Sequence, residues 1–319
     1  MKKIGNHAPA ARSMDFLKRS GQLAGKWGRS GPDPFQGWRV LGTYGTGTKK
    51  DAGNRDCAYL ASWSGGKDST ASIILAHEYN EPLNRILFSE VMFDERTSGE
   101  LPEHMEFMEQ RAAPLFRRWG YQVDILHSNR TYMDLFNRCP TSGKWAGTGM
   151  RSGFPMALKC AVNRDVKIRP IKECLKDYTG KTIQYIGIAA DEPERLERMK
   201  SKGDNRISLL EKYGYTEQMA KELCLQYGLL SPVYGFSKRG GCWFCPNAGK
   251  RELRHLRDCH PDLWKALLGL EEREGLIAPI WNTLTNTSIH RWESRFRDED
   301  AQMTLEEWAR ILESGDSAA

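Results

Sequence analysis

The sequence predicts an α/β protein: a doubly wound, mostly parallel sheet with a helical, cysteine-containing C-terminal region. Two observations lead to this fold class. From residue 57 onward, short apolar runs alternate with segments of helical periodicity, and this alternation implies right-handed crossovers between parallel strands. The hydrophobic content of 39% is that of a chain able to build a large core.

The expected elements follow one another along the chain. The apolar run at 57–63 is typical of a buried strand, a glycine loop follows it, and the apolar face of residues 68–79 predicts the first helix. Further strands are expected at 85–93, 121–126 and 182–190, and helices at 102–119, at 207–227 and through most of 250–276. Ligands of such sheets bind beyond the carboxyl ends of the strands, where the glycine loop lies.

The chain divides into three expected regions: an N-terminal extension (1–56), the α/β domain (57–240) and the C-terminal region (241–319). The extension is rich in glycine and carries 11 Lys and Arg against 4 Asp and Glu, whereas the whole chain has a net charge of +6. Such a basic segment is either a solvated extension or an arm attracted to polyanions such as nucleic acid.

No run approaches the ~20 apolar residues that a membrane span needs, and the first residues lack the apolar stretch of an export signal. We therefore expect a cytoplasmic protein without a membrane partner. In that reducing compartment, the eight cysteines favour metal or redox chemistry over structural disulfides.

The loop at 64–70 (SGGKDST) has the composition of a phosphate cradle. Gly65 and Gly66 permit a tight turn and a close backbone approach, and the following helix adds the positive end of its dipole. Hydroxyl groups and the ammonium of Lys67 would complete the site, although the spacing of a Walker A loop is absent. The alternative is an ordinary glycine-rich turn between a strand and a helix.

An acidic pair, Asp191 and Glu192, follows the strand expected at 182–190. The two carboxylates would either hold Mg²⁺ together with nucleotide phosphates or pair with Arg195 one turn later. The residues assigned to nucleotide binding are Ser64, Gly65, Gly66, Lys67, Asp68, Ser69, Thr70, Asp191, Glu192 and Arg195.

A dense cationic stretch consists of Lys159, Arg164, Lys167 and Arg169. Guanidinium groups bind phosphate and sulfate oxygens bidentately, so this stretch suits the anionic end of a substrate. The alternative is a solvated basic face.

Cys242 and Cys245 form a Cys-x-x-Cys motif, a spacing that lets two thiolates hold one tetrahedral metal or one edge of a cluster. A redox pair would need a reactive cysteine in a thioredoxin-like setting, which is missing. We favour an iron–sulfur cluster over zinc, and zinc over ordinary buried thiols. Cys259 is preferred to Cys139 as a further ligand.

The loop at 64–69, at the end of a first strand, resembles the PP-loop signature of the adenine nucleotide alpha-hydrolase-like superfamily. That Rossmann-like group includes ATP pyrophosphatases, tRNA thiolases and sulfonucleotide reductases. The resemblance implies that the loop wraps nucleotide phosphates and that Lys67 neutralises their charge.

Later segments are similar to the phosphoadenosine phosphosulfate (PAPS) reductase branch of this superfamily. They are residues 98–104 (SGELPEH), 153–155 (GFP), 160–170 (CAVNRDVKIRP) and 187–195 (GIAADEPER), the last with Ala189 where arginine is usual. The resemblance covers about residues 57–275 and implies that Cys160 joins the Cys-x-x-Cys pair as a cluster ligand. The branch's tail cysteine has no counterpart after Cys259, so reduction through such a thiol is not expected.

The expected function is that of an enzyme that holds ATP or an adenylyl sulfonucleotide with Mg²⁺ and acts at the α-phosphate or the attached sulfate. Lys67, Asp68 and Arg164 are its expected catalytic residues, and a [4Fe-4S] cluster its second cofactor.

Two alternatives are kept. One is ATP-dependent adenylation coupled to sulfur transfer onto nucleic acid, by resemblance to the PP-loop proteins of DNA phosphorothioation. Its partners would be nucleic acid, bound by the N-terminal extension, and a sulfur-donor protein. The other is a non-catalytic, nucleotide-sensing subunit.

Overall fold

The structure is a computed structural model that describes residues 57–155, 160–176, 178–203 and 205–314, with the backbone alone for 303–314. These residues belong to one compact unit, Asn54–Ala319. The N-terminal extension and Lys159 lie outside the described residues, so what the sequence predicts for them stays a prediction.

Five strands form one parallel sheet, which confirms the α/β class. The strands are Cys57–Trp63 (β1), Arg85–Glu90 (β2), Gln122–His127 (β3), Lys181–Tyr185 (β5) and Arg206–Ile207 (β6). Their order is β3-β2-β1-β5-β6, so the chain moves outward from β1 to β3 and then returns to the other side of β1. Leu60 in the central strand pairs with Arg85 of β2 and with Gln184 of β5.

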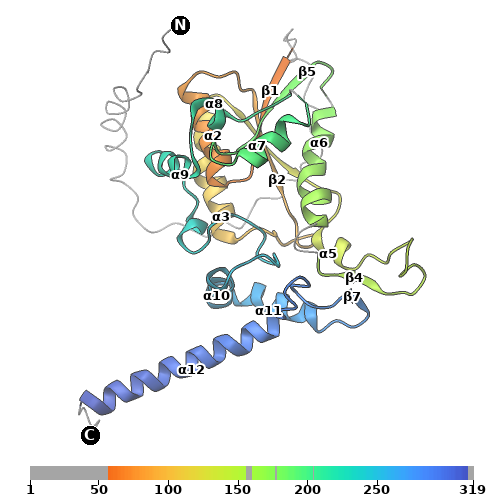
Figure 1. Cartoon of the computed structure of the whole chain (residues 1–319), viewed down its shortest axis with the longest axis vertical. Helices are drawn as coiled ribbons and strands as arrows, with labels where there is room; N and C mark the ends of the chain where they lie inside the picture. Colours follow the sequence, from red (N-terminus) through yellow and green to blue (C-terminus); the bar gives the residue numbers. More distant parts are fainter. Residues whose placement is uncertain (1–56, 156–159, 177, 204, 315–319) are drawn as a thin grey trace. The chain divides into compact units, whose positions relative to one another are not determined.

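Helices flank this sheet (Figure 1). They are Lys67–Glu78 (α2), Pro102–Glu106 (α3), Ala113–Arg118 (α4), Arg169–Lys176 (α6), Pro193–Lys200 (α7), Leu209–Tyr213 (α8) and Glu217–Gln226 (α9). Helix α2 packs against α8 and α9, whereas α6 contacts β2 and β3 from the opposite side of the sheet.

The remaining elements lie outside this sheet. They are the helices Tyr132–Phe136 (α5), Lys250–Cys259 (α10), Pro261–Glu271 (α11) and Ile289–Ser314 (α12), the short 3-10 helix Pro232–Gly235 (η3), and the parallel pair Arg151–Gly153 (β4) and Leu276–Ala278 (β7). None of the helices in the described part of the chain combines the length and the apolar character that a bilayer crossing requires.

Two helical stretches are wound as π-helix, Phe107–Ala112 (η1) between α3 and α4, and Asn163–Ile168 (η2) before α6. The helix expected at 102–119 is therefore continuous, with a wider middle section. A π-turn adds a residue and re-aims the side chains that follow, and such turns are frequent at functional sites. The second of them carries Lys167.

The helical stretch expected at 207–227 is two helices. Ser208 caps α8 by accepting the N–H of Glu211, and Gly214 ends that helix with a φ of +70°, which favours glycine. Thr216 then caps α9 through its side chain. Local signals therefore account for the break.

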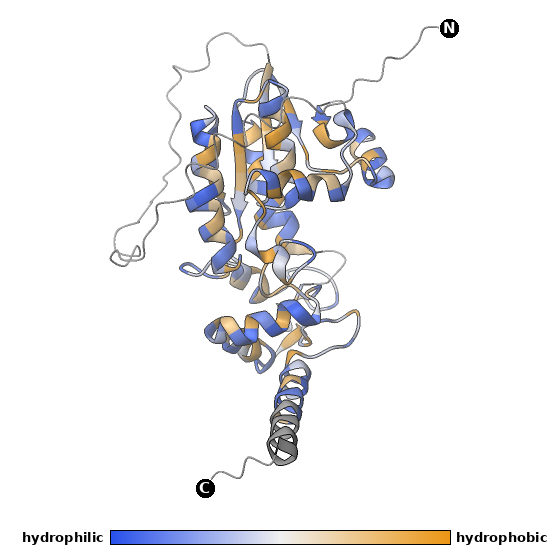
Figure 2. Ribbon diagram, turned by 90° about the vertical axis from the view of Figure 1, so that its left-hand side faces the viewer, coloured by the Kyte–Doolittle hydropathy of each residue, from blue (hydrophilic) through white to orange (hydrophobic). Residues whose placement is uncertain are grey.

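Two large hydrophobic clusters, and a small one of Ile188, Leu196 and Met199, hold the described residues together. The first joins the sheet to the α2 side and includes Trp63, Ile74 and Phe116. The second includes Tyr132 of α5 together with Phe244 of the C-terminal region. The division expected at residue 240 therefore passes through a shared core. Hydrophilic and hydrophobic segments alternate along the helices in Figure 2, as expected for helices with one buried face.

Candidate functional site

The loop between β1 and α2 is held in shape by its own groups. Gly65 has a φ of +69°, and a Cβ there would lie 2.5 Å from Cε1 of His104. The hydroxyl of Ser69 accepts the N–H of Ser64 at 3.2 Å and donates to the carbonyl of Gly66 at 3.0 Å. The turn therefore depends on glycine at 65 and on a hydroxyl at 69.

A cavity of about 200 Å³ lies against this loop. Its lining residues are Ser64, Gly66, Asp68, Ser69, Glu100, Lys167, Gly187, Arg195, Tyr234, Arg239, Gly240 and Gly241. They come from the loop, from segments that follow β2 and β5, from η2, and from the residues just before the Cys-x-x-Cys motif. The loop and the segment after β5 meet where the strand order reverses, and open α/β sheets bind their ligands at such points.

Gly187 lies on the wall of the cavity opposite the loop, and its lack of a side chain lets this wall approach the loop closely. A Cβ at Gly187 would lie 2.5 Å from the backbone nitrogen of Ser69 and 2.7 Å from the carbonyl carbon of Asp68. Strand β5 ends at Tyr185, earlier than the sequence predicts, and the irregular residues that follow bring Gly187 against the first turn of α2.

Asp68, rather than Lys67, lines the cavity. The Nζ of Lys67 lies 2.8 Å from Oδ1 of Asp68 and 3.1 Å from Oε2 of Glu217, and its backbone N–H donates to Oη of Tyr234 at 2.8 Å. Burial lowers the pKa of Lys67, but the two carboxylates raise it above its ordinary value, so the ammonium stays charged. In this structure the charge of the ammonium compensates the charges of Asp68 and Glu217.

Carboxylates gather beside Asp68. Burial raises the pKa of Asp68, and although Lys67 lowers it, the charges of Glu217 and Glu192 raise it further. A divalent cation would relieve this repulsion, and carboxylate oxygens are the ligands that Mg²⁺ prefers.

Of the two roles that the sequence leaves open for the acidic pair, the structure shows the ion pair. Glu192 pairs with Arg195 and also accepts the N–H of Ala189 at 3.1 Å. The exposed Asp191 accepts the N–H of Glu217 at 3.0 Å, at the start of α9.

Two buried groups support the loop from behind. Thr70, assigned to the nucleotide from sequence, accepts the indole N–H of Trp63 at 3.0 Å instead. The ring of His104 spans 2.7 Å to Oγ of Ser231 and 3.3 Å to the carbonyl of Ser64. Burial lowers the pKa of His104, so the ring is neutral. A carbonyl only accepts, so Nε2 carries the proton and Nδ1 accepts from the serine.

Among the cations predicted to bind the substrate anion, the structure brings Lys167 to the cavity. Its Nζ lies 2.7 Å from Oε1 of Glu100, which also lines the cavity. Burial lowers the pKa of Lys167, but Glu100 and two cysteine thiols, Cys242 first, raise it above its ordinary value. It therefore stays charged.

Arg164 and Arg169 are placed elsewhere. Both are exposed, and each lies 2.7 Å from a carboxylate, that of Asp165 and that of Glu173 respectively. Neither lines the cavity. Successive positions of one helical stretch point in different directions, so a run of cations in sequence does not form one site.

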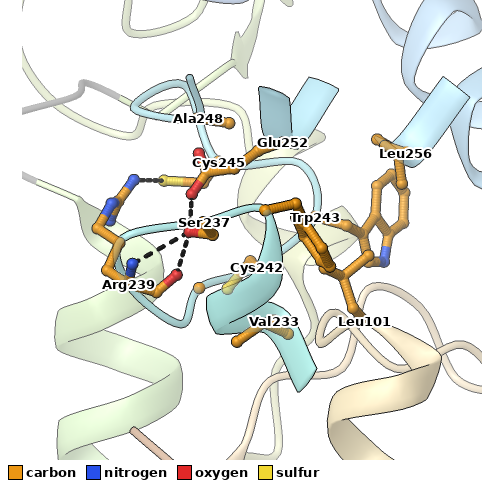
Figure 3. A pocket seen from close by; sticks show the side chains of 12 residues that line it. Leu101, Val233, Ser237, Arg239, Cys242, Trp243, Cys245, Ala248, Glu252 and Leu256 are labelled. Atoms are coloured by element: carbon orange, nitrogen blue, oxygen red, sulfur yellow. Dashed lines mark hydrogen bonds between the residues drawn. The ribbon is translucent and has the colours of Figure 1, made fainter. Parts of the chain in front are cut away.

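Cys160 and Cys242, two of the cysteines assigned to the metal, pack against the hydrophobic cluster that includes Tyr132, whose hydroxyl is buried. Burial raises the pKa of that hydroxyl, and the charges of Cys160, Cys242 and Cys245 raise it further. Burial also raises the pKa of the Cys242 thiol, while Lys167 lowers it. Figure 3 shows the guanidinium of Arg239 directed at Sγ of Cys245, 3.4 Å away.

Cys259, the fourth predicted ligand, is exposed at the end of α10. Cys139 is also exposed and donates to the carbonyl of Gly149 at 3.8 Å.

Cys160, Cys242 and Cys245 are the candidate ligands for a metal ion or a cluster. The hydroxyl of Tyr132 is buried and has no hydrogen-bond partner among the described residues, a condition that costs roughly 1–3 kcal/mol. Sulfide and thiolate sulfurs would accept this hydrogen bond. Ligand sulfurs on one zinc lie about 3.8 Å apart, for a tetrahedron with Zn–S of about 2.3 Å. In the described residues the three thiols do not all fall within 4.8 Å of one another.

Tyr234 and Arg239 are site residues that sequence reasoning missed. Both lie shortly before the Cys-x-x-Cys motif, and this position is their one sequence signal. The supporting pair of His104 and Ser231 joins positions 127 residues apart, and no local pattern marks it.

Comparisons of the chain with protein-family models, with curated proteins and with solved structures found no match in any of the three. The fold and the site define an α/β protein with a charged cavity between a glycine loop and a group of cysteines.

Proposed function

We propose that this chain is a cytoplasmic PP-loop enzyme of the PAPS reductase branch, with a doubly wound sheet, and that it binds ATP or an adenylyl sulfonucleotide with Mg²⁺. The observation that carries the proposal is the cavity, with the glycine loop on one wall and Lys167, Arg195 and Arg239 on the others. Loop, helix N-terminus and cations together suit the phosphate or phosphosulfate chain.

Catalysis in such a site is mainly electrostatic. The hydroxyl of Ser64 and the first-turn amides of α2 donate to phosphate oxygens, the hydroxyl of Ser69 holds the loop in shape, and Asp68 offers a carboxylate to Mg²⁺. Lys167 and Arg239 stabilise charge that develops at the α-phosphate or at the attached sulfate. Arg164, which the sequence placed among the catalytic residues, holds a surface ion pair, so Lys167 takes the role of substrate cation.

Cys160, Cys242 and Cys245 would hold a [4Fe-4S] cluster, with zinc as the alternative. When bound, the cluster would supply electron transfer or sulfur handling next to the nucleotide. The residues that connect the two sites are Lys167, which lines the cavity and lies near Cys242, and Arg239, which lines it and contacts Cys245.

A second function is favoured by this adjacency of cavity and cysteines. The enzyme would adenylate the nucleic acid with release of pyrophosphate, and a sulfur nucleophile from the donor would then displace AMP. The basic N-terminal extension would then supply phosphate contacts, and a sulfur-donor protein would be a further partner. Binding of ATP without conversion, with all acceptors tested, would instead favour a nucleotide-sensing subunit.

Lys67→Ala should weaken the binding of ATP with Mg²⁺ by about tenfold or more. The reason is that Asp68 and Glu217 would lose their counter-ion and repel the phosphates. Calorimetric titration measures the effect. Lys212→Ala is the matched control, because this exposed lysine pairs with Glu81 on the surface and its loss should leave the affinity unchanged. Equal affinity of Lys67→Ala and the unaltered protein would contradict the loop assignment.

Tyr132→Phe tests the fit between chain and cluster. The metal-free variant should be at least as stable as the metal-free parent, because the deleted hydroxyl has no partner there. The iron-loaded variant should lose about 1 kcal/mol relative to the loaded parent and show an altered EPR spectrum, because a hydrogen bond to sulfur is missing. Thermal unfolding with and without iron provides the comparison. A loss of stability that is the same in both states would count against the assignment.

A further inference from the structure

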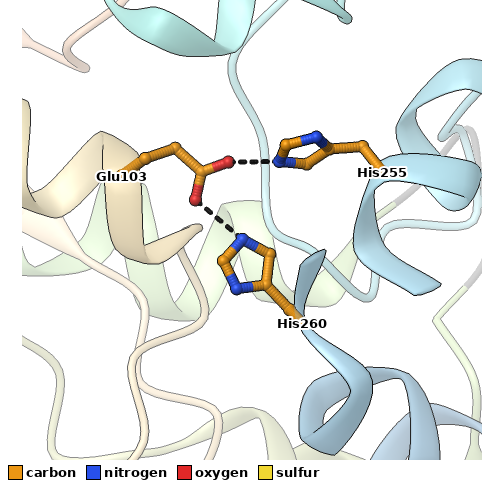
Figure 4. A group of neighbouring side chains, drawn as sticks. All are labelled: Glu103, His255 and His260. Atoms are coloured by element: carbon orange, nitrogen blue, oxygen red, sulfur yellow. Dashed lines mark hydrogen bonds and ion pairs between the residues drawn. The ribbon is translucent and has the colours of Figure 1, made fainter. Parts of the chain in front are cut away.

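A second group of ligand-type side chains lies outside the cavity and the cysteine group. Glu103 comes from α3, His255 from α10, and His260 from the junction of α10 and α11 (Figure 4). Their ligand atoms all lie within 4.8 Å of one another, the one group of three or more that the described residues contain. Glu103 lies more than 150 residues before the two histidines, so no local sequence pattern marks this group.

The three side chains are aimed at one another. Each carboxylate oxygen of Glu103 faces one imidazole nitrogen, with Nε2 of His255 at 2.5 Å and Nε2 of His260 at 2.9 Å. Their side chains are between 19% and 24% exposed, so an ion can reach them from solvent while most of the site stays shielded. Both histidines thus present the same nitrogen to one point.

The ring of His255 is held in place independently of Glu103. It stacks on Phe236, with ring centroids 3.7 Å apart and planes inclined by 11°. The backbone of His260 is fixed between two helices, since its N–H donates to Leu256 at 2.9 Å and its carbonyl accepts from Trp264 at 3.0 Å. Ligands held before binding lose little freedom when an ion arrives.

Two imidazole nitrogens and one carboxylate oxygen are a ligand set that binds zinc in a tetrahedron with one position left for water. Without a metal, the two hydrogen bonds to Glu103 need a proton on Nε2 of both histidines. A bound ion replaces these protons and is coordinated by the same three side chains. The two states therefore differ by a metal and by protons, with little rearrangement of the chain.

We propose that Glu103, His255 and His260 bind Zn²⁺ or a similar first-row divalent ion. The ion ties α3, which begins two residues after the cavity residue Glu100, to α10, which begins five residues after Cys245. It thereby connects the two segments that flank the nucleotide cavity and the cysteine group. The proposal does not depend on the identity of the nucleotide or on the presence of a cluster.

Zinc and cobalt titrations of the full chain test the site. After treatment with chelator, Zn²⁺ should raise the melting temperature of the unaltered protein, because it binds the folded state. His260→Ala and Glu103→Gln should bind Zn²⁺ about tenfold or more weakly and lose that rise. His290→Ala is the matched control, an exposed histidine near Glu272.

The absorption spectrum of bound Co²⁺ separates this site from the cysteines. Nitrogen and oxygen ligands give weak visible bands without the strong charge-transfer band of cobalt thiolates. We expect a component of the first kind that His260→Ala and Glu103→Gln both remove. Glu103→Gln replaces the carboxylate by an amide of the same size that can still form hydrogen bonds. This variant therefore tests the site even if His260→Ala fails to fold. Zinc binding that is equal in Glu103→Gln and in the unaltered protein would overturn the proposal.

Discussion

Gly187→Ala is expected to weaken nucleotide binding by about tenfold or more while the sheet stays folded. The new Cβ would meet the backbone nitrogen of Ser69 at 2.5 Å, and neither backbone segment can turn away as a side chain can. Overpacking of this kind costs typically about 1–3 kcal/mol, released here by moving the loop away from the segment after β5. Calorimetric titration with ATP and Mg²⁺ measures the loss, and circular dichroism checks the fold.

Gly235→Ala is the control for this substitution. Gly235 belongs to η3, next to the cavity residue Tyr234, yet a Cβ there meets nothing within 4 Å. Its affinity for nucleotide should match that of the unaltered protein. If Gly187→Ala binds as tightly as Gly235→Ala, the close approach of loop and opposite wall has no part in the site.

Cys242→Ser is expected to abolish the iron and sulfide content of protein purified without oxygen. Cys242 is half-buried, packs with Cys160 against the second hydrophobic cluster, and has Lys167 as its neighbouring cation. A serine hydroxyl is a poor ligand for iron in place of a thiolate. Elemental analysis and visible absorption provide the readout. Iron retained in full by Cys242→Ser, or a colourless protein that contains zinc instead, would remove the proposed cluster.

Single substitutions of the two exposed cysteines decide the fourth ligand. If Cys259→Ser loses the cluster and Cys139→Ser keeps it, the ligand predicted from sequence is right, and the end of α10 must move toward the group on binding. The reverse result assigns Cys139. Retention of the cluster by both variants implies three protein ligands, with the fourth iron open to substrate.

The arrangement of charge explains why the cavity and the cysteine group lie together. Lys167 is flanked by Glu100 and by the thiols, and these anions keep its ammonium charged despite burial. Arg239 likewise lines the cavity and donates toward Cys245. Two cations thus lie between two expected anions, the phosphates and the cluster. A change in charge at one site would therefore change the electrostatic potential at the other.

The α/β class, the strand, loop and helix around Gly65 and Gly66, and the grouping of Cys242 with Cys245 could be predicted from the amino-acid sequence alone. These follow from periodicities and turn residues that act within a few positions of the chain. The strand expected at 182–190 extends further than β5, which ends at Tyr185. Beyond that residue Gly187 packs closely against α2, and the pattern of apolar residues along a strand does not predict such a contact.

The contacts between polar side chains could not be predicted in this way, because they join distant parts of the chain. Lys67 is paired with Glu217, 150 residues away, and Glu103 lies between His255 and His260. Lys167 is half-buried and pairs with the buried Glu100. The neighbouring Arg164 and Arg169 are exposed and pair with carboxylates at the surface. Contacts of this kind arise when separately formed helices and strands pack, and their partners are set by that packing rather than by spacing along the chain.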